Sequence, residues 1–174
     1  MAGAVAFLRT LGAAETEHPG GTLLAHLQRV SRLLEAWGAG RELRLAGLCH
    51  AFYGTDGFAP SLLPLESRDQ LARHIGTDAE ELVYLYASCD RKASYRELAS
   101  ENGTFRDRFT GRTFSPAPRR RREFAELTAA NELDLAGIDP AFRAEWGEGL
   151  LNLLTRWRPL LSDQAWAHTQ KTLT

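Results

Sequence analysis

Apolar residues recur every three or four positions along most of this chain, which is the pattern of helices that bury one face. The clearest stripe begins after Thr22, a residue type that caps helix N-termini, and ends at Gly38. Its apolar positions are Leu23, Leu27, Val30, Leu34 and Trp37. No stretch alternates apolar and polar residues with the β-branched side chains typical of strands. We therefore predict an all-α, compact helical bundle of about seven to eight helices.

Other helices are predicted from the same periodicity and from their terminal residues. The predicted elements are 1–12, 41–52, 119–135, a helix with Asp139 as N-cap and Pro140 at its first position, and a short helix from Ser162. The helix after Pro140 has one apolar face formed by Phe142, Trp146, Leu150, Leu153 and Trp157. Capping boxes, in which two side chains satisfy each other's backbone donors, are predicted for Thr77 with Glu80, Ser94 with Glu97 and, more weakly, Ser67 with Gln70.

Two segments are predicted to be loops. The stretch 101–118 contains Gly, Pro and scattered aromatic residues without a helical period, so we expect a long, mobile loop of the kind often used as a lid. The second, Tyr53-Gly54-Thr55-Asp56-Gly57, follows closely on His50 and is rich in glycine.

Length and composition narrow the possible classes of protein. A chain of 174 residues fits one domain, 1–174, with one core. A net charge of -1 with 25% charged residues is that of an ordinary globular protein and speaks against a nucleic-acid partner. Residues 1–12 lack the basic start of a signal peptide, and no stretch is apolar enough to span a membrane. Cys49 and Cys89 form no CxxC pattern, so we expect two buried thiols in a cytoplasmic protein with no membrane partner.

Three polar residues share the apolar faces of three predicted helices. His26 lies three positions after Leu23, His50 follows the stripe of the helix 41–52, and Asn131 lies four positions after Leu127. We predict that His26, His50 and Asn131 converge in one cavity. The alternative is that each is a core residue with a hydrogen bond of its own, because buried polar groups are satisfied without being functional.

The stretch TLLAHLQRVSRLLEAWGAGRELRLAGLCH resembles the HD superfamily of metal-dependent phosphohydrolases, in which histidines and aspartates bind one or two metal ions. The resemblance matches His26 to the first histidine, His50 to the histidine of the His-Asp pair and Asn131 to the later aspartate. Ala51 stands where the aspartate of the pair belongs, and the amide of Asn131 is a poor ligand for a hard cation. The resemblance therefore implies a degenerate metal site and no phosphohydrolase activity of the HD type.

The strings HPGGTLLAHL, AGLCHAFYGTDGF, LVYLYASCDR and LTAANELD are similar, more narrowly, to an uncharacterised group of HD-like proteins. This resemblance covers most of residues 18–135 and implies an HD-like fold. The pocket residues that it implies are His18, His26, His50, Tyr53, Thr55, Asp90, Arg91 and Asn131.

A metal site is one reading of these residues. A Gly-Gly bend after His18 would fold that residue back over the cavity, and Asp56 would supply the carboxylate that Ala51 lacks. His18, His26, His50 and Asp56 would then hold one divalent ion, Fe, Zn or Mn, with an open position.

Arg91 and the arginine run 119–122 have two readings each. Adjacent residues on a helix diverge, so Asp90 and Arg91 fit a helix-end charge and a solvated side chain. Facing a pocket instead, Arg91 would bind a carboxylate or phosphate while Asp90 orients a histidine. The run 119–122 fits a solvated face, although cations at a helix N-terminus oppose the helix dipole and make an anionic partner worth testing.

Two functions from different classes fit this sequence. The first is a small-molecule enzyme with His50, His26, Tyr53 and Asn131 as catalytic residues and Thr55, Asp90 and Arg91 as substrate-binding residues, using a metal or histidine acid/base chemistry. The 101–118 loop would cover its pocket. The second is a non-catalytic HD-like module that binds a nucleotide, metabolite or partner protein. In either case we expect His50 to matter more to function than to folding, because it ends its helix beside a glycine-rich loop.

Overall fold

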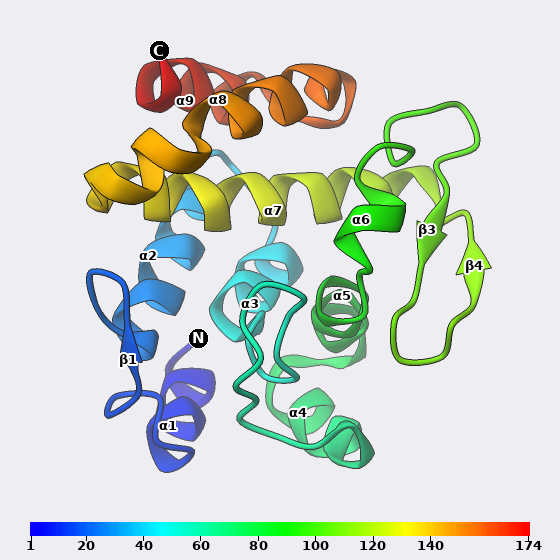
Figure 1. Cartoon of the computed structure of the whole chain (residues 1–174). Coiled ribbons are helices and arrows are strands. Elements are labelled where there is room, and N and C mark those ends of the chain that lie inside the picture. Colours follow the sequence, from blue (N-terminus) through cyan, green and yellow to red (C-terminus); the bar gives the residue numbers. More distant parts are fainter.

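The computed structural model describes residues 1–174 and is predominantly helical (Figure 1). The α-helices are α1 Ala2–Thr10, α2 Leu23–Ala36, α3 Arg41–Cys49, α4 Arg68–Ile75, α5 Thr77–Ala87, α6 Arg91–Ser94, α7 Pro118–Ile138, α8 Pro140–Arg156 and α9 Asp163–Leu173. Two short 3-10 helices, Leu65–Ser67 and Arg158–Leu160, connect them. The all-α prediction is confirmed. The nine α-helices exceed the expected seven or eight because the four-residue α6 was not anticipated.

Two antiparallel hairpins of minimal length accompany the helices. In the first, β1 (Glu17–His18) pairs with β2 (Gly21–Thr22), so that His18 lies opposite Gly21. In the second, β3 (Phe105–Arg106) pairs with β4 (Thr113–Phe114). The first hairpin turns through Gly20 and Gly21, whose φ angles of 75° and 127° are accessible to glycine but disfavour other residues. This turn carries His18 back toward α2, which is the bend that the Gly-Gly pair predicts.

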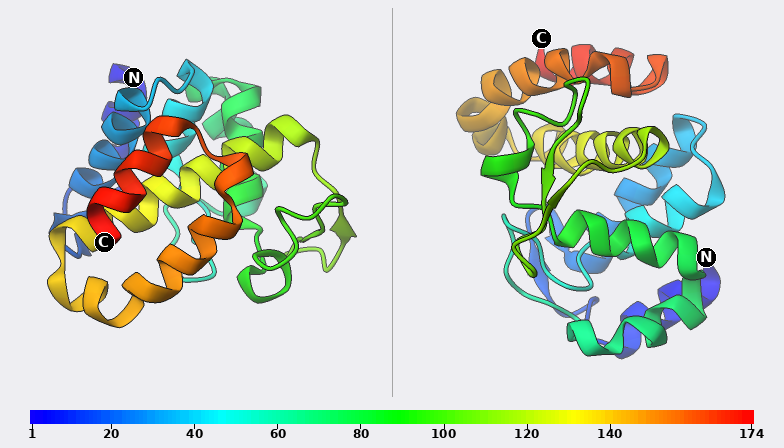
Figure 2. Two further views of the ribbon diagram at one scale, coloured as in Figure 1. Left: turned by 90° about the horizontal axis from the view of Figure 1, so that it is seen from above. Right: turned by 90° about the vertical axis from the view of Figure 1, so that its right-hand side faces the viewer.

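Helix α7 is the central element of the fold. It packs against α2, α3 and α5 on one side and against α8 and α9 on the other (Figures 1 and 2). Such a position requires apolar or small residues around the whole helix, and the middle of α7 supplies them with Phe124, Leu127 and Leu133 among alanines. Polar side chains that α7 carries toward α2 are consequently buried between two helices.

The N-termini of three helices lie where their capping residues predict them. Thr22, Asp139 and Ser162 cap α2, α8 and α9 as predicted, each accepting a hydrogen bond from a backbone N–H of the first turn. The remaining predicted caps are wrong. Thr77 lies inside α5, whose N-cap is Gly76, and Ser67 precedes α4 without a side-chain cap.

The two capping-box partners have tertiary roles instead. Glu80 is buried, and its carboxylate accepts hydrogen bonds from Tyr53 Oη at 2.9 Å and from Arg68 Nε at 2.7 Å. Ser94 ends α6, whose N-cap is Asp90, and the Ser94 hydroxyl accepts a hydrogen bond from the backbone N–H of Arg106. These long-range bonds satisfy the side chains better than a local cap would in the buried setting that the fold creates.

The segment 101–118 is not a lid. It forms the β3–β4 hairpin, and Arg106 and Asp107 bond to α6 and to Tyr84 of α5. The hairpin lies beyond α6, and none of its residues lines the cavity that contains the histidines (Figure 1).

Helix α8 also differs from the expectation that one of its faces is buried. The side chain of Trp146 is 53% exposed although it shares a face with the buried Trp157.

Two further expectations concern the cysteines and the membrane. Cys49 and Cys89 are both buried free thiols, as predicted, and burial raises the pKa of each. None of the helices combines the length with the apolar character that crossing a bilayer requires.

Candidate functional site

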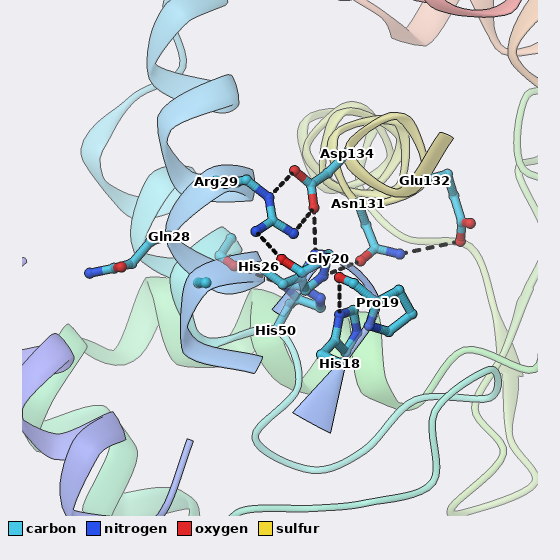
Figure 3. A network of polar contacts seen from close by, with 12 residues as sticks. His18, Pro19, Gly20, His26, Gln28, Arg29, His50, Asn131, Glu132 and Asp134 are labelled. Carbon is cyan, nitrogen blue, oxygen red and sulfur yellow. Dashed lines mark hydrogen bonds and ion pairs between the residues drawn. The ribbon is translucent and has the colours of Figure 1, made fainter. Parts of the chain in front are cut away.

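Three histidines and an asparagine meet at one cavity of about 230 Å³ between α2, α3, α7 and the β1–β2 hairpin (Figure 3). His26 comes from α2, His50 from the end of α3, Asn131 from α7 and His18 from β1. The ring of His18 stacks on that of His26 with centroids 4.2 Å apart, and His26 meets His50 edge-on at 5.3 Å. The predicted convergence of His26, His50 and Asn131 is therefore present.

Both ring nitrogens of His26 are engaged. Nδ1 lies 2.7 Å from Asp134 Oδ2, and Nε2 lies 3.0 Å from Asn131 Oδ1. The amide of Asn131 is oriented by Glu132, whose carboxylate accepts a hydrogen bond from Asn131 Nδ2. Two side chains of α7 therefore hold the His26 ring from both of its nitrogens. His26 stands at the centre of the site in a fixed orientation.

Asp134 provides the counter-charge for this ring. Its two oxygens also accept hydrogen bonds from Arg29 Nε at 2.8 Å and Nη2 at 3.0 Å, a bidentate arrangement that fixes the carboxylate. Burial by itself raises the pKa of Asp134, but the hydrogen bonds from His26 and Arg29 outweigh it and keep this pKa below its usual value. The ion pair ties α2 to α7 directly behind the cavity.

His50 presents a different chemistry. Its Nδ1–H donates to the carbonyl oxygen of Gly47 at 2.8 Å, one helical turn earlier. A donor at Nδ1 leaves Nε2 of the neutral ring with a lone pair on the edge away from α3. Burial and the nearby charge of His26 lower the pKa of His50 from 6.5 to about 3, so the ring is neutral at physiological pH. Its tautomer is thus set by a backbone carbonyl.

His18 covers the outer side of the cavity. It is partly buried, and its Nδ1 approaches the carbonyl oxygen of Pro19 at 3.4 Å. Partial burial and the charge of His26 lower the pKa of His18 to about 4. A second neutral imidazole, stacked on His26, therefore stands between the cavity and solvent.

The rim of the cavity carries both a neutral hydroxyl group and charged side chains. Thr55 contributes a hydroxyl from the loop after α3. Arg91 extends from the start of α6 and forms an ion pair with Glu132 at 3.2 Å, while its guanidinium lies within 3.5 Å of the position that a Cβ on Gly57 would occupy. Gly57 thus leaves room for Arg91 to lie across the loop at the edge of the cavity.

Three expected pocket residues lie elsewhere. The hydroxyl of Tyr53 donates to Glu80, and Tyr53 does not line the cavity. Asp90 is the N-cap of α6, accepts a hydrogen bond from the backbone N–H of Ala93 and does not line the cavity. Asp56 accepts a hydrogen bond from the backbone N–H of Arg91 and points its carboxylate at α6. None of the three lines the histidine cavity, although Asp56 lines the cavity next to it.

The donor set does not fit a metal ion. No group of three or more His, Cys, Asp or Glu side chains is arranged to hold one. Both ring nitrogens of His26 and the oxygen of Asn131 are engaged with neighbouring side chains. The carboxylate of Asp56 is held by α6, and Ala51 has no ligand atom. The predicted ligand set His18, His26, His50 and Asp56 is consequently not assembled in this arrangement.

The arginine run 119–122 is largely neutralised within the chain. Arg119 and Arg120 pair with Glu123, Arg120 also pairs with Glu81, and Arg121 donates to the carbonyl oxygens of Leu98 and Ser100. The carbonyls and carboxylates around the start of α7 offset the charge that opposes its dipole. The interpretation as a solvated, internally paired face therefore describes this run.

The sequence analysis missed Asp134, Arg29 and Glu132. Two of them carried a usable signal: Arg29 lies three positions after His26 and Asp134 three positions after Asn131, so each shares a face with a residue already chosen. Glu132 gave no such signal, because it is adjacent to Asn131 and adjacent residues on a helix diverge. The place of Glu132 at the rim becomes visible only through its ion pair with Arg91, which comes from α6.

Comparison with known proteins gives one match. Neither curated proteins nor solved structures yielded a similar protein. Residues 7–91, just under half of the chain, match the model of a protein family described as a domain of unknown function, DUF6817. The matched segment extends from α1 to the start of α6 and contains His18, His26, His50, Thr55 and Arg91, whereas Asn131 and Asp134 lie outside it.

Proposed function

We propose that this chain is a small-molecule enzyme that acts on a hydroxylated metabolite by metal-free histidine chemistry, with His50 as proton acceptor. The observation that carries the proposal is the fixed tautomer of His50: Gly47 holds the hydrogen on Nδ1 and leaves a lone pair on Nε2 in a polar cavity. A hydroxyl or other acidic proton of a ligand is the natural partner of that lone pair.

The neighbouring groups support the same assignment. The ring of His26, held by Asp134, which also binds Arg29, has its centroid 5.3 Å from that of His50. When His50 takes a proton from the ligand, the ligand gains negative charge, and in this proposal a protonated His26 ring already held in place stabilises that charge without rearrangement. Asn131 Nδ2, which has a second hydrogen besides the one given to Glu132, is a candidate donor to the same oxygen. Isomerisation, elimination or cyclisation is the class of reaction that such a proton transfer begins.

A second candidate, a non-catalytic binding module, is favoured by one observation. A general base is most effective when its pKa lies near the working pH, and burial lowers the pKa of His50 to about 3. The developing charge of a bound ligand must raise this pKa for proton transfer to be efficient. Without such a ligand charge, His50 is a hydrogen-bond acceptor that selects ligands rather than a base that transforms them. The two candidates share one binding site and differ in turnover.

We further propose that the scaffold is HD-like and that its ancestral metal site has been replaced by the ion pairs around His26. The resemblance of the histidine pattern supports this relation, together with the position of His26 and His50 on consecutive helices that face α7. In this view Asn131 and Asp134 hold His26 in place of a metal ion.

The test begins with a thermal-shift screen of α-hydroxy acids, polyols, phenols and nucleosides. Compounds that stabilise the native chain are titrated against His50→Gln and against His74→Gln, which removes an exposed histidine that stacks on Phe7 away from the cavity. We expect at least one compound whose affinity falls about fivefold or more in His50→Gln, the cost of one hydrogen bond, and is unchanged in His74→Gln. If His50→Gln retains both the affinity and the turnover of the native chain, the proposal is wrong.

Turnover separates the two candidates. Each bound compound is incubated with the protein in deuterium oxide, and exchange at carbon or product formation is followed by proton magnetic resonance. Exchange that requires His50 supports the enzyme, whereas His50-dependent binding without any exchange or product supports the binding module.

A further inference from the structure

A second and larger cavity adjoins the histidine cavity. It has a volume of about 580 Å³ and lies between α6, α7, α8 and the loop after α3. Its apolar wall consists of Tyr95, Phe142, Trp146, Leu150 and Leu153. Trp146, one of the few large apolar residues exposed on this protein, is 53% accessible and forms the outer part of this wall. The wall explains why the apolar face of α8 is buried only toward its C-terminal end.

The two cavities share part of their lining. Gly57, Arg91, Glu132 and Phe142 line both of them. The Arg91–Glu132 ion pair stands at the junction, and the absence of a side chain at Gly57 leaves room for the Arg91 guanidinium there. One side of the junction therefore offers imidazole, amide and hydroxyl groups, and the other offers aromatic and aliphatic surface.

The polar groups of one cavity and the apolar surface of the other indicate the class of ligand. Ligand sites are mostly apolar with a few placed polar groups, and together these cavities have that composition. We infer that the two cavities form one site for an amphipathic small molecule, whose hydroxyl-bearing end lies at His50 and whose apolar chain or ring lies against Trp146. This inference rests on the proposed function, because it takes the histidine cavity as the polar end of the site. An exposed tryptophan beside a polar cavity is then the outer half of a binding site.

Straight-chain alcohols are suitable probes because they vary the apolar part and keep the hydroxyl. Dissociation constants of 1-butanol, 1-hexanol and 1-octanol are measured by titration followed in two-dimensional amide resonance spectra. In the native chain we expect each added CH₂ to tighten binding about three- to fourfold, as burial of a methylene group requires. Trp146→Ala should reduce this dependence on chain length, because it removes the outer wall of the apolar cavity. His50→Gln should weaken all three alcohols by a similar factor of about five, because it acts on the shared hydroxyl.

Phe114→Ala is the matched control. Phe114 is an aromatic residue of similar exposure, 40%, on the β3–β4 hairpin and lines neither cavity. We expect it to leave the constants of all three alcohols unchanged. Because Trp146 is largely exposed, its replacement should leave the fold intact, which the amide spectrum itself reports.

The outcomes distinguish the inference from the function on which it rests. A chain-length dependence that is the same in native chain and Trp146→Ala overturns the joined site, and the proposed function survives if His50→Gln still weakens every alcohol. A dependence that Trp146→Ala abolishes while His50→Gln changes nothing overturns both, because the alcohols then bind the apolar cavity alone. Sedimentation that reveals a dimer dissolved by Trp146→Ala also overturns the inference, since the apolar wall then belongs to a contact between two copies. Absence of binding by all three alcohols overturns it as well.

Discussion

The three cavity histidines differ in the atoms that surround them. His26 is held between a carboxylate and an amide oxygen, His50 donates to a backbone carbonyl, and His18 stacks on the ring of His26 near solvent. The same side chain is therefore held at both ring nitrogens in one position and at Nδ1 alone in another. The pKa of His50, lowered by burial and by the charge of His26, makes this difference measurable.

We predict that His50 makes the protein sensitive to mild acid. Between pH 6.5 and about 3 the unfolded chain binds a proton at this residue and the folded chain does not, so stability falls as the pH decreases through this window. At pH 5 the contribution of His50 amounts to a loss of about 2 kcal/mol in the free energy of unfolding relative to neutral pH. Denaturant unfolding of the native chain and of His50→Gln at pH 7 and pH 5 measures it.

The comparison of the native chain with His50→Gln measures the contribution of His50 alone. The pKa values of His18 and His168 are also lowered, by burial first, and their effects are present in both proteins and cancel. Asp134, whose pKa is lowered from 3.8, contributes stability that is lost mainly below pH 3.8 and so hardly changes between pH 7 and pH 5. An equal loss of stability in His50→Gln and in the native chain would show that His50 does not titrate as described.

At the scale of single elements, helix starts fall into two groups. Local caps such as Asp139, which accepts hydrogen bonds from the backbone N–H groups of Ala141 and Phe142, follow from sequence alone. Where a side chain of the right type is drawn into the interior, as Glu80 is by Tyr53 and Arg68, the predicted local cap does not form.

We predict that Asp139→Ala and Thr77→Ala affect stability very differently. Asp139→Ala removes the carboxylate that accepts hydrogen bonds from two backbone N–H groups at the start of α8. It should lower the free energy of unfolding by about 1 kcal/mol. Thr77 is exposed inside the first turn of α5 and caps nothing, so Thr77→Ala should change it by less than about 0.5 kcal/mol. Urea unfolding of the two variants, prepared in parallel, provides the measurement. Equal losses would mean that Thr77 caps α5 after all.

At the scale of the whole molecule, α7 holds the two sides of the fold together and forms one wall of the candidate site. Its Asp134 contacts both His26 and Arg29 of α2, so side chains of the protein itself satisfy this buried carboxylate.

We therefore predict that the stability of the protein does not depend on a divalent metal. A ligand that binds only the folded state raises the melting temperature, so removal of a structural ion would lower it. Thermal unfolding before and after dialysis against EDTA should agree within about 1 °C, far less than the change expected from a loss of 1 kcal/mol. A lower melting temperature after dialysis, restored by Zn²⁺, Mn²⁺ or Fe²⁺, would show that a metal site exists.

Local interactions made much of the fold predictable from the sequence. The spacing of apolar residues identified α2, α3, α7 and α8, and Thr22, Asp139 and Ser162 marked the starts of α2, α8 and α9. Both features depend on residues within one or two helical turns. The same spacing placed His26, His50 and Asn131 on inward faces. It did not anticipate α6 or the hairpin at 105–114, which are too short to show a period.

Only the tertiary structure decided which polar groups pair. Asp134 and Asn131 lie 108 and 105 positions from His26 along the chain, and no local pattern encodes such a bond. Tyr53 and Asp56 illustrate the same limit, since their neighbourhood in sequence suggested the cavity while Glu80 and the start of α6 hold them elsewhere. The reason is physical: apolar periodicity sets which face of a helix is buried, whereas a buried polar atom bonds to whichever partner the packing of distant helices brings within reach.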